Sequence, residues 1–237
     1  MPSAFPTPPK AVLLDVGGIF FVPDHDRIIG AFERAGFTPA ADLDRAHYAG
    51  ARAFPADDEQ LDWAKRWRAY LDGYMTECAT PDDLRDEVHQ HLDSEFADAA
   101  LWLHELPGSR SGLRTLADAG VRLGIVSNAD GLIGQRLAEC EILQVGPGIG
   151  VDVECVIDSG AVGVMKPDPR IFHLALDAMG LAPGDAWYVG DMPGVDVAGA
   201  RAAGLHPVLM DPYAFHLDAD YSRVASLTEL AGIVSAA

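Results

Sequence analysis

The chain has 237 residues and a formal net charge of −19, with 36 acidic against 17 basic side chains. This excess of negative charge disfavours contact with a phosphate backbone, so we expect no nucleic-acid partner. Hydrophobic residues make up 49% of the sequence, which excludes a chain that is disordered throughout. No apolar run approaches the roughly 18 residues needed to span a bilayer, and residues 1–9 lack a secretory signal. We therefore expect a cytoplasmic protein without a membrane partner.

The first predicted strand is the apolar run 11–14, which ends at Asp15 and is followed by Gly17 and Gly18. Such a run is typical of a buried strand in a parallel sheet. A carboxylate at its end lies at the carboxyl edge of the sheet, where α/β proteins bind ligands. The two glycines allow close approach of the backbone to a ligand. Taken alone, the stretch fits an aspartate that caps a turn equally well.

Residues 24–103 differ in character, being rich in Ala, Asp, Glu, Arg, Trp and Leu. Apolar spacing predicts helices near 28–35, 61–71 and 84–92, the second with acidic start signals at 57–59. We expect a helical bundle inserted after the first strand. Its histidines, His47 among them, are expected to pack or to lie at the surface, because no metal-ligand spacing recurs.

From residue 105 onward, predicted strands and helices alternate. Strands are expected near 121–126, 153–157, 186–189 and 207–210, with helices near 109–120, 131–140, 168–179, 194–203 and 227–234. Strands separated by helices of this length predict βαβ crossovers and a parallel sheet. The fold class is therefore α/β with an inserted all-α segment.

Polar residues follow the predicted strands at points that can share one edge of the sheet. Besides Asp15 they are Ser127, Lys166, Asp191 and Asp196. Together they fit phosphoryl transfer. Asp15 and Asp191 would supply hard oxygen ligands for Mg²⁺, with Asp196 adding charge or holding a bound water. The second oxygen of Asp15 would attack phosphorus and form an aspartyl-phosphate.

The remaining polar groups would bind the substrate. Ser127 and Lys166 would contact the oxygens of the transferring phosphoryl group, and Lys166 would offset the repulsion between nucleophile and substrate. Backbone amides at Gly17 and Gly18 could complete an anion-binding nest. Asn128, next to Ser127, is placed with these substrate-binding residues.

Four segments resemble the motifs of the haloacid dehalogenase-like hydrolase superfamily, in order and with compatible spacing. They are 15–19, 126–128, 166–168 and 190–191 with Asp196. The resemblance implies a Rossmann-like, doubly wound core from residues 1–23 and 104–237. It implies an α-helical cap at 24–103, and most often Mg²⁺-dependent hydrolysis of a small phosphate ester. Oligomeric state is left open between monomer and homodimer.

One departure concerns Gly17. Phosphatases of this superfamily usually carry a second Asp there as general acid, which contributes about 10²–10⁴-fold to the rate. A metal contact through the Gly17 carbonyl survives the change, but protonation of the leaving alcohol does not. We therefore expect a slower enzyme, a substrate with a good leaving group, or an acid supplied by the cap. Candidates for that acid are Asp24, His25 and Asp26, although a helix N-cap explains this cluster better.

Two alternatives remain. A 2-haloacid dehalogenase-type hydrolase also lacks the second Asp, but it usually has an aromatic residue and Gly-Thr after the nucleophile, where this chain has residues 16–19. A non-catalytic member that binds a phospho-ligand or a partner would explain the loss of the acid. Retention of Asp15, Ser127, Lys166 and Asp191 disfavours it.

Overall fold

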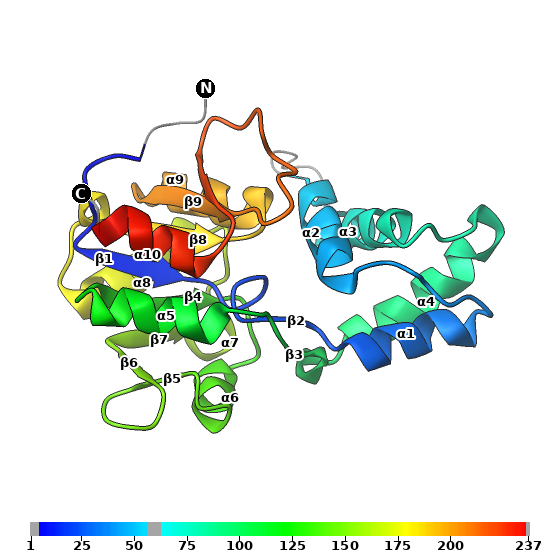
Figure 1. Cartoon of the computed structure of the whole chain (residues 1–237), viewed down its shortest axis with the longest axis horizontal. Coiled ribbons are helices and arrows are strands. Elements are labelled where there is room, and N and C mark those ends of the chain that lie inside the picture. The colour runs from blue at the N-terminus through cyan, green and yellow to red at the C-terminus, as the bar shows by residue number, and fades with distance from the viewer. Residues whose placement is uncertain (1–4, 56–62, 236–237) are drawn as a thin grey trace.

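A computed structural model describes residues 5–55 and 63–235, which form two parts connected by a pair of strands (Figure 1). The larger part contains a six-stranded sheet of order β10-β9-β8-β1-β4-β7, in which all paired strands are parallel. Its strands are β1 (Ala11–Leu14), β4 (Arg122–Ser127), β7 (Cys155–Asp158), β8 (Ala186–Gly190), β9 (His206–Met210) and β10 (Ser222–Val224). The predicted α/β fold with a parallel sheet is confirmed, and β10 is a strand that the sequence analysis did not include.

Helices cover both faces of the sheet, because alternate residues of a strand point to opposite sides. Val12 and Leu14 belong to one hydrophobic cluster with residues of α5, α6 and α10, whereas Ala11 and Leu13 belong to another with residues of α8 and α9. This is the doubly wound, Rossmann-like arrangement. The helices of this part are α5 (Ser109–Asp118), α6 (Ile133–Glu139), α7 (Ser159–Val162), α8 (Pro169–Met179), α9 (Ala198–Ala202) and α10 (Leu227–Ser235). A short parallel pair, β5 (Leu143–Val145) and β6 (Val151–Val153), lies beside the main sheet and was not predicted.

The second part, residues 24–101, is called the helical insertion below. The chain enters it through β2 (Phe21–Pro23) and returns through β3 (Trp102–Glu105), and these two strands pair antiparallel. Its helices are α1 (His25–Arg34), α2 (Leu43–Ala53), α3 (Trp63–Glu77) and α4 (Arg85–Phe96). Three of them match the predicted helices, whereas α2 was not predicted. The predicted start signals at 57–59 lie outside the described residues.

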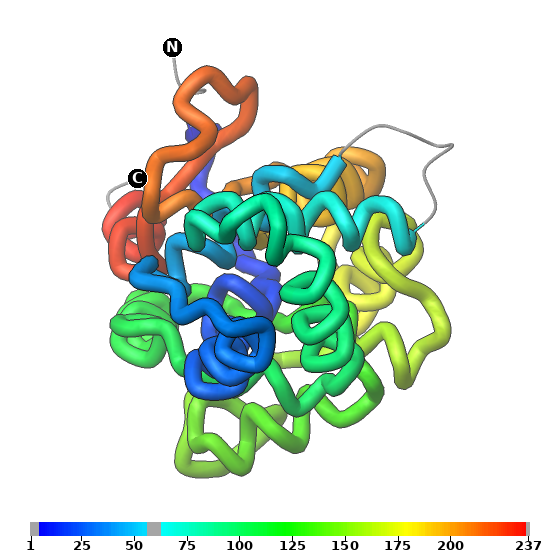
Figure 2. The backbone as a smooth tube through the Cα atoms, turned by 90° about the vertical axis from the view of Figure 1, so that its right-hand side faces the viewer, coloured from blue at the N-terminus to red at the C-terminus, as the bar shows by residue number. Residues whose placement is uncertain are grey.

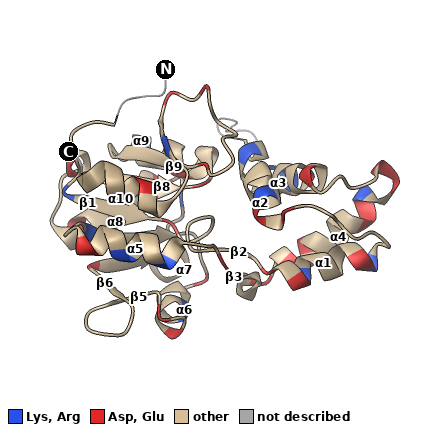
Figure 3. Ribbon diagram, viewed as in Figure 1, with Lys and Arg blue, Asp and Glu red and all other residues tan. Residues whose placement is uncertain are grey.

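The helical insertion has its own hydrophobic cluster, in which Phe32, Tyr70 and Leu92 are fully buried. Acidic and basic residues are distributed along the helices of the insertion (Figure 3). Arg27 and Arg34 of α1 each lie 2.7 Å from a carboxylate oxygen of Glu95 on α4. This cluster also contains Val195 of the core, and Tyr48 of the insertion belongs to a cluster of the core, so the division of the chain at 24 and 103 stays a prediction.

Helix α2 of the insertion makes hydrogen bonds with the core. The Tyr48 hydroxyl donates to the Gly18 carbonyl at 2.6 Å. From the loop after β9, the Tyr213 hydroxyl donates at 2.8 Å to the carboxylate of Asp42, the N-cap of α2. That loop reaches across to α2 in Figure 1, and Figure 2 shows the insertion helices in front of the core. Among the described residues, no helix has both the length and the apolar character needed to cross a membrane.

Candidate active site

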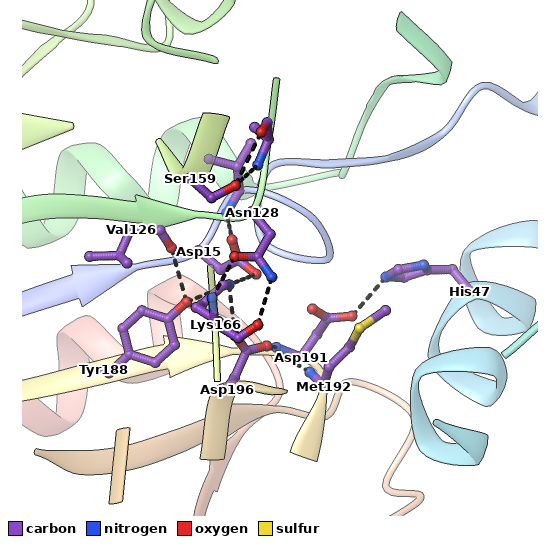
Figure 4. A network of polar contacts seen from close by, with 12 residues as sticks. Asp15, His47, Val126, Asn128, Ser159, Lys166, Tyr188, Asp191, Met192 and Asp196 are labelled. Carbon is purple, nitrogen blue, oxygen red and sulfur yellow. Dashed lines mark hydrogen bonds and ion pairs between the residues drawn. The ribbon is translucent and has the colours of Figure 1, made fainter. Parts of the chain in front are cut away.

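The carboxyl ends of the central strands bring the predicted site residues together. The register pairs Leu14 of β1 with Ile125 of β4 and with Val189 of β8. Residues that follow these positions therefore meet at one edge of the sheet, where ligands bind in open α/β folds. Figure 4 shows Asp15, Lys166, Asp191 and Asp196 converging there.

Lys166 is the cation of this cluster and is 1% exposed. Its Nζ lies 2.6 Å from Asp15 Oδ2 and 2.8 Å from Asp196 Oδ1. The other oxygen of Asp15, Oδ1, accepts a hydrogen bond from the Val16 backbone N–H at 2.7 Å. The Asp15 carboxylate is thus held at both oxygens, with Oδ2 beside the ammonium group.

Asp196 organises the groups around it. It lies in a short π-helical turn, Pro193–Val197, where its Oδ2 accepts from the backbone N–H groups of Asp191 at 3.1 Å and Met192 at 2.9 Å. Its Oδ1 accepts from Lys166 and lies 3.1 Å from the Tyr188 hydroxyl. Both oxygens of Asp196 therefore accept hydrogen bonds that fix the Asp191 loop and the lysine, and the predicted role as a metal ligand stays a prediction.

Tyr188 is a member of the site that the sequence analysis did not include. Its hydroxyl accepts from Lys166 Nζ at 2.8 Å and lies 3.0 Å from the Val126 carbonyl. With a single proton, the hydroxyl can donate either to that carbonyl or to Asp196. The side chain is fully buried on β8, so it forms part of the rigid floor that positions the lysine. An inward-facing polar residue on a predicted central strand is the signal that could have identified it.

His47 of α2 reaches the same edge from the helical insertion. It is fully buried, and its Nε2 lies 2.9 Å from Asp191 Oδ2 (Figure 4). The two atoms are close, but the ring N–H is not aligned with the oxygen, and neither atom has a hydrogen-bond partner of good geometry. The other ring nitrogen, Nδ1, lies 2.8 Å from the Tyr70 hydroxyl. Two buried polar atoms, one from each part of the chain, therefore face each other without a proper hydrogen bond.

Ser127 is the last residue of β4, and Asn128 follows it. Ser127 is 4% exposed at the carboxyl edge. The Asn128 side chain contacts the backbone of Lys166 on both sides, accepting from its N–H at 2.8 Å and donating to its carbonyl at 3.1 Å. Asn128 therefore positions the lysine in this structure, and its predicted contact with substrate stays a prediction.

The two glycines after Asp15 lie in tight surroundings. Gly18 has φ +65°, and a Cβ there would overlap the Asp191 side chain. Its N–H donates to the Phe21 carbonyl at 2.8 Å and closes the turn. At Gly17, a Cβ would lie 3.4 Å from the Trp102 ring. The space beside residue 17 is thus bordered by an indole from β3.

Burial and charge together shift the pKa values of the site. Burial raises the pKa of Asp15 to about 6, and Asp196 and Asp191 add to this while Lys166 opposes it. Burial likewise raises the pKa of Asp191, against the opposing effect of His47. Burial alone would lower the pKa of Lys166, but the charges of Asp15 and Asp196 outweigh it and raise that pKa. The site thus holds more negative than positive charge.

The chain also matches a known protein family. The model of the haloacid dehalogenase-like hydrolase family matches residues 9–204, a range that includes the site residues and the helical insertion. The chain belongs to this family. The predicted resemblance is therefore confirmed, and the chain is a hydrolase of the haloacid dehalogenase-like type.

Curated relatives of this hydrolase include named phosphatases. It is 51% identical over 67 residues to a phosphoserine phosphatase of Thermus thermophilus, a match that covers 28% of this chain and 27% of that protein. It is 30% identical over 229 residues to a phosphoglycolate phosphatase of Rhodospirillum rubrum, covering 94% and 86% of the two chains. Several other curated relatives are matched over about half of their length.

Solved structures share the fold of this hydrolase. A haloacid dehalogenase-superfamily hydrolase from Ehrlichia chaffeensis superimposes with a TM-score of 0.56 at 14% identity, covering 97% of this chain and 98% of that one. At this identity the likeness shows the fold alone, because one fold hosts many activities.

The site of this hydrolase fits a divalent cation. Carboxylate oxygens of Asp15, Asp191 and Asp196 lie within 4.8 Å of one another and all three residues are buried. Such oxygens are the ligands that Mg²⁺ prefers. Asp191 Oδ2 is buried without a hydrogen bond, and one lysine faces three carboxylates. An added positive charge would satisfy that oxygen and balance the cluster.

Of the three cap candidates for a general acid, Asp26 is exposed, and the other two have contacts elsewhere. Asp24 is the N-cap of α1 and accepts from the Arg27 N–H at 3.0 Å. His25 lies 2.9 Å from Asp44. The insertion residue that reaches the carboxylates is His47, whose contact depends on how α2 packs against the core. No spacing within the sequence indicates that contact.

Proposed function

We propose that the chain is a Mg²⁺-dependent phosphatase that hydrolyses a small phosphate ester through an aspartyl-phosphate on Asp15. The observation that carries this is the buried contact of Asp15 Oδ2 with Lys166 Nζ at 2.6 Å, beside an Asp191 oxygen that has no hydrogen bond. The phosphatase names of two relatives support the same reaction class. The substrates in those two names are those of the relatives. The match to the phosphoserine phosphatase covers 28% of this chain, and the match to the phosphoglycolate phosphatase covers 94%.

Asp15 is the proposed nucleophile. One carboxylate oxygen attacks phosphorus, the bond to the leaving oxygen breaks, and the leaving group takes a proton. Water then attacks the acyl phosphate, releasing inorganic phosphate and regenerating the carboxylate. Lys166, already beside Oδ2, would lower the repulsion between this carboxylate and an anionic substrate and bind the charge that spreads over the phosphoryl oxygens. Ser127 would bind another of those oxygens from the end of β4.

Asp15 and Asp191 are the residues that would hold the metal ion, with the Gly17 carbonyl as a further ligand. Bound Mg²⁺ would neutralise charge on the transferring phosphoryl group and orient it toward Asp15. Asp196 would act indirectly, by holding the Asp191 loop and Lys166 in place. The grouping of Asp191 and Asp196 with Asp15 favours a metal-dependent reaction over the dehalogenase alternative, because three carboxylates whose oxygens lie within 4.8 Å of one another suit a bound cation.

The helical insertion is proposed to serve as a cap. His47 from its helix α2 would donate a hydrogen bond from Nε2 to the leaving-group side of the substrate. In the tautomer in which the Tyr70 hydroxyl donates to Nδ1, the ring proton is on Nε2, and this is the tautomer that the proposed role requires. A hydrogen bond to a charged group typically contributes about 1.5–3 kcal/mol. We therefore expect His47→Ala to lower kcat/KM by about 10- to 100-fold.

The deciding experiment measures hydrolysis of para-nitrophenyl phosphate and a panel of sugar and acyl phosphates, with and without Mg²⁺. The wild type, Asp15→Asn and His47→Ala are compared, with His91→Ala on α4 as the control histidine. Metal-dependent turnover that Asp15→Asn abolishes and His91→Ala retains is the expected result. Turnover that persists in Asp15→Asn, or that is unaffected by chelating the metal, would contradict the proposal. Chloride release from a 2-haloacid would support the dehalogenase alternative instead.

A further inference from the structure

A second cluster of metal-binding side chains lies at the base of the helical insertion. His25 opens α1, His104 lies on β3 and Asp44 lies in the first turn of α2. One donor atom from each lies within 4.8 Å of the other two. The three come from segments far apart in the sequence, and each is half-buried.

The distances between the donor atoms are close to those between the ligand atoms of a bound metal ion. His25 Nε2 lies 2.9 Å and His104 Nε2 lies 3.9 Å from Asp44 Oδ1. Ligand atoms at the corners of a tetrahedron with bonds of about 2.0–2.1 Å are separated by about 3.3 Å. The two distances lie on either side of that value. The two imidazole rings stack with their centroids 3.6 Å apart and 18° between their planes, so one ring has to turn out of this stack before the in-plane lone pairs of both nitrogens can point at one ion.

The contacts in the structure leave this donor set incompletely used. Asp42, not Asp44, caps α2, so the Asp44 carboxylate faces His25 rather than the helix N-terminus. The 3.9 Å separation between His104 and Asp44 is too long for a hydrogen bond. Two imidazoles thus face one carboxylate oxygen, and one of them makes a hydrogen bond to it.

We propose that His25, Asp44 and His104 bind a divalent first-row metal ion of the Zn²⁺ type. Two imidazole nitrogens and one carboxylate oxygen suit Zn²⁺ and disfavour Mg²⁺, which prefers oxygen ligands alone. This site is separate from the Asp15, Asp191 and Asp196 cluster and takes a different class of ion. Three protein ligands leave a fourth position for water.

A metal ion at this position would link the core and the helical insertion. His104 lies on β3, one of the two strands that connect core and insertion, and His25 directly follows β2 through Asp24. On α2, Asp44, His47 and Tyr48 are spaced i, i+3 and i+4, so they share one face of the helix. An ion on Asp44 would therefore tie the connecting strands to the helix whose His47 and Tyr48 contact the core.

Calorimetric titration of the full chain with Zn²⁺ tests the site, with excess Mg²⁺ present to occupy the carboxylate cluster. We expect one Zn²⁺ per wild-type chain at this site, and at least tenfold weaker binding in His25→Gln and in His104→Gln. His91→Gln, which removes a histidine elsewhere in the insertion, should bind as the wild type does. Zn²⁺ binding that is the same in His25→Gln, His104→Gln and wild type would overturn the proposal.

Three further measurements keep the result independent of folding defects and of turnover. Asp44→Asn preserves shape and removes the anionic ligand, so it should also bind Zn²⁺ more weakly while its metal-free Tm stays near that of the wild type. Co²⁺ should give visible absorption bands in the wild type that His104→Gln lacks. An anomalous difference peak at the zinc edge away from these three side chains would sink the assignment.

Discussion

At the scale of single residues, the site is governed by a surplus of buried negative charge. Asp15 lies beside Lys166, but it also lies near Asp191 and Asp196, and all are removed from water. The raised pKa of Asp15 expresses the cost of keeping its carboxylate ionised in the folded state. That cost makes a prediction about stability as well as about chemistry.

Asp15→Asn should raise the stability of the metal-free protein at pH 7. The folded-state pKa of Asp15 is raised from 3.8 to about 6. Its favourable contribution is therefore present below about pH 4 and is lost as the pH rises through about 6. A difference of about 2 in pKa corresponds to about 3 kcal/mol. In the variant, Lys166 keeps Asp196 and Tyr188 as partners, so no unpaired charge is created.

Urea unfolding at pH 4 and pH 7 in the presence of a chelator measures this. The variant should gain over the wild type at pH 7 and lose that gain at pH 4. Asp168→Asn serves as the control of opposite sign, because hydrogen bonds from Arg170 lower the pKa of the partly exposed Asp168 to about 2. That variant should lose stability at pH 7 relative to the wild type. An Asp15→Asn protein that is less stable than the wild type at pH 7 would contradict the interpretation.

At the scale of elements, the turn after β1 depends on Gly18. It has φ +65°, which costs about 1–2 kcal/mol for a residue with a side chain, and its Cβ would overlap Asp191. Gly18→Ala should therefore destabilise the protein by more than this backbone term and should impair turnover.

Gly36→Ala provides a matched control. Gly36 has φ +77°, but a Cβ there would have no neighbour within 4 Å. Thermal unfolding of both variants should show a small loss for Gly36→Ala and a larger one for Gly18→Ala. Equal losses would mean that the Asp191 contact contributes nothing beyond backbone strain.

The same scale shows what the sequence can and cannot predict. Strands that end in polar residues predict where Asp15, Ser127 and Asp191 lie, because apolar runs and turn residues are local signals. Local apolar signals do not predict helix α2, because it packs through small residues. A Cβ at Gly50 would lie 2.9 Å from Tyr70 of α3. The contact of His47 with Asp191 depends on the relative placement of two separately packed parts. No local pattern contains that information.

At the scale of the whole molecule, the helical insertion and the core share both apolar and polar contacts: Tyr48 packs in a hydrophobic cluster of the core, and Val195 of the core packs in that of the insertion. Tyr48 donates to the Gly18 carbonyl at 2.6 Å, and Tyr213 donates to Asp42 at 2.8 Å. Interfaces of this kind within one chain permit relative movement of the parts. The closed arrangement should therefore be weakened by removing one such bond.

Tyr48→Phe should favour opening of the insertion, since it removes the hydroxyl and leaves the ring in place. Hydrogen exchange at residues 15–21 should become faster than in the wild type. Tyr74→Phe is the control, because it removes a buried hydroxyl within the insertion that makes a longer, 3.4 Å hydrogen bond to Leu43. Unchanged exchange at 15–21 in Tyr48→Phe would show that its hydroxyl does not hold the two parts together.

The indole of Trp102 beside Gly17 limits which side chains position 17 can hold. A Cβ at position 17 would already touch the ring at 3.4 Å, so a carboxylate one bond further out has to share space with an apolar surface. Replacing the indole alone would leave a void between insertion and core. An aspartate at position 17 therefore needs either a rotamer that turns its carboxylate away from the ring or a smaller side chain at position 102. Positions 17 and 102 are therefore expected to vary as a pair among relatives, with an acidic residue at 17 accompanied by a smaller residue at 102.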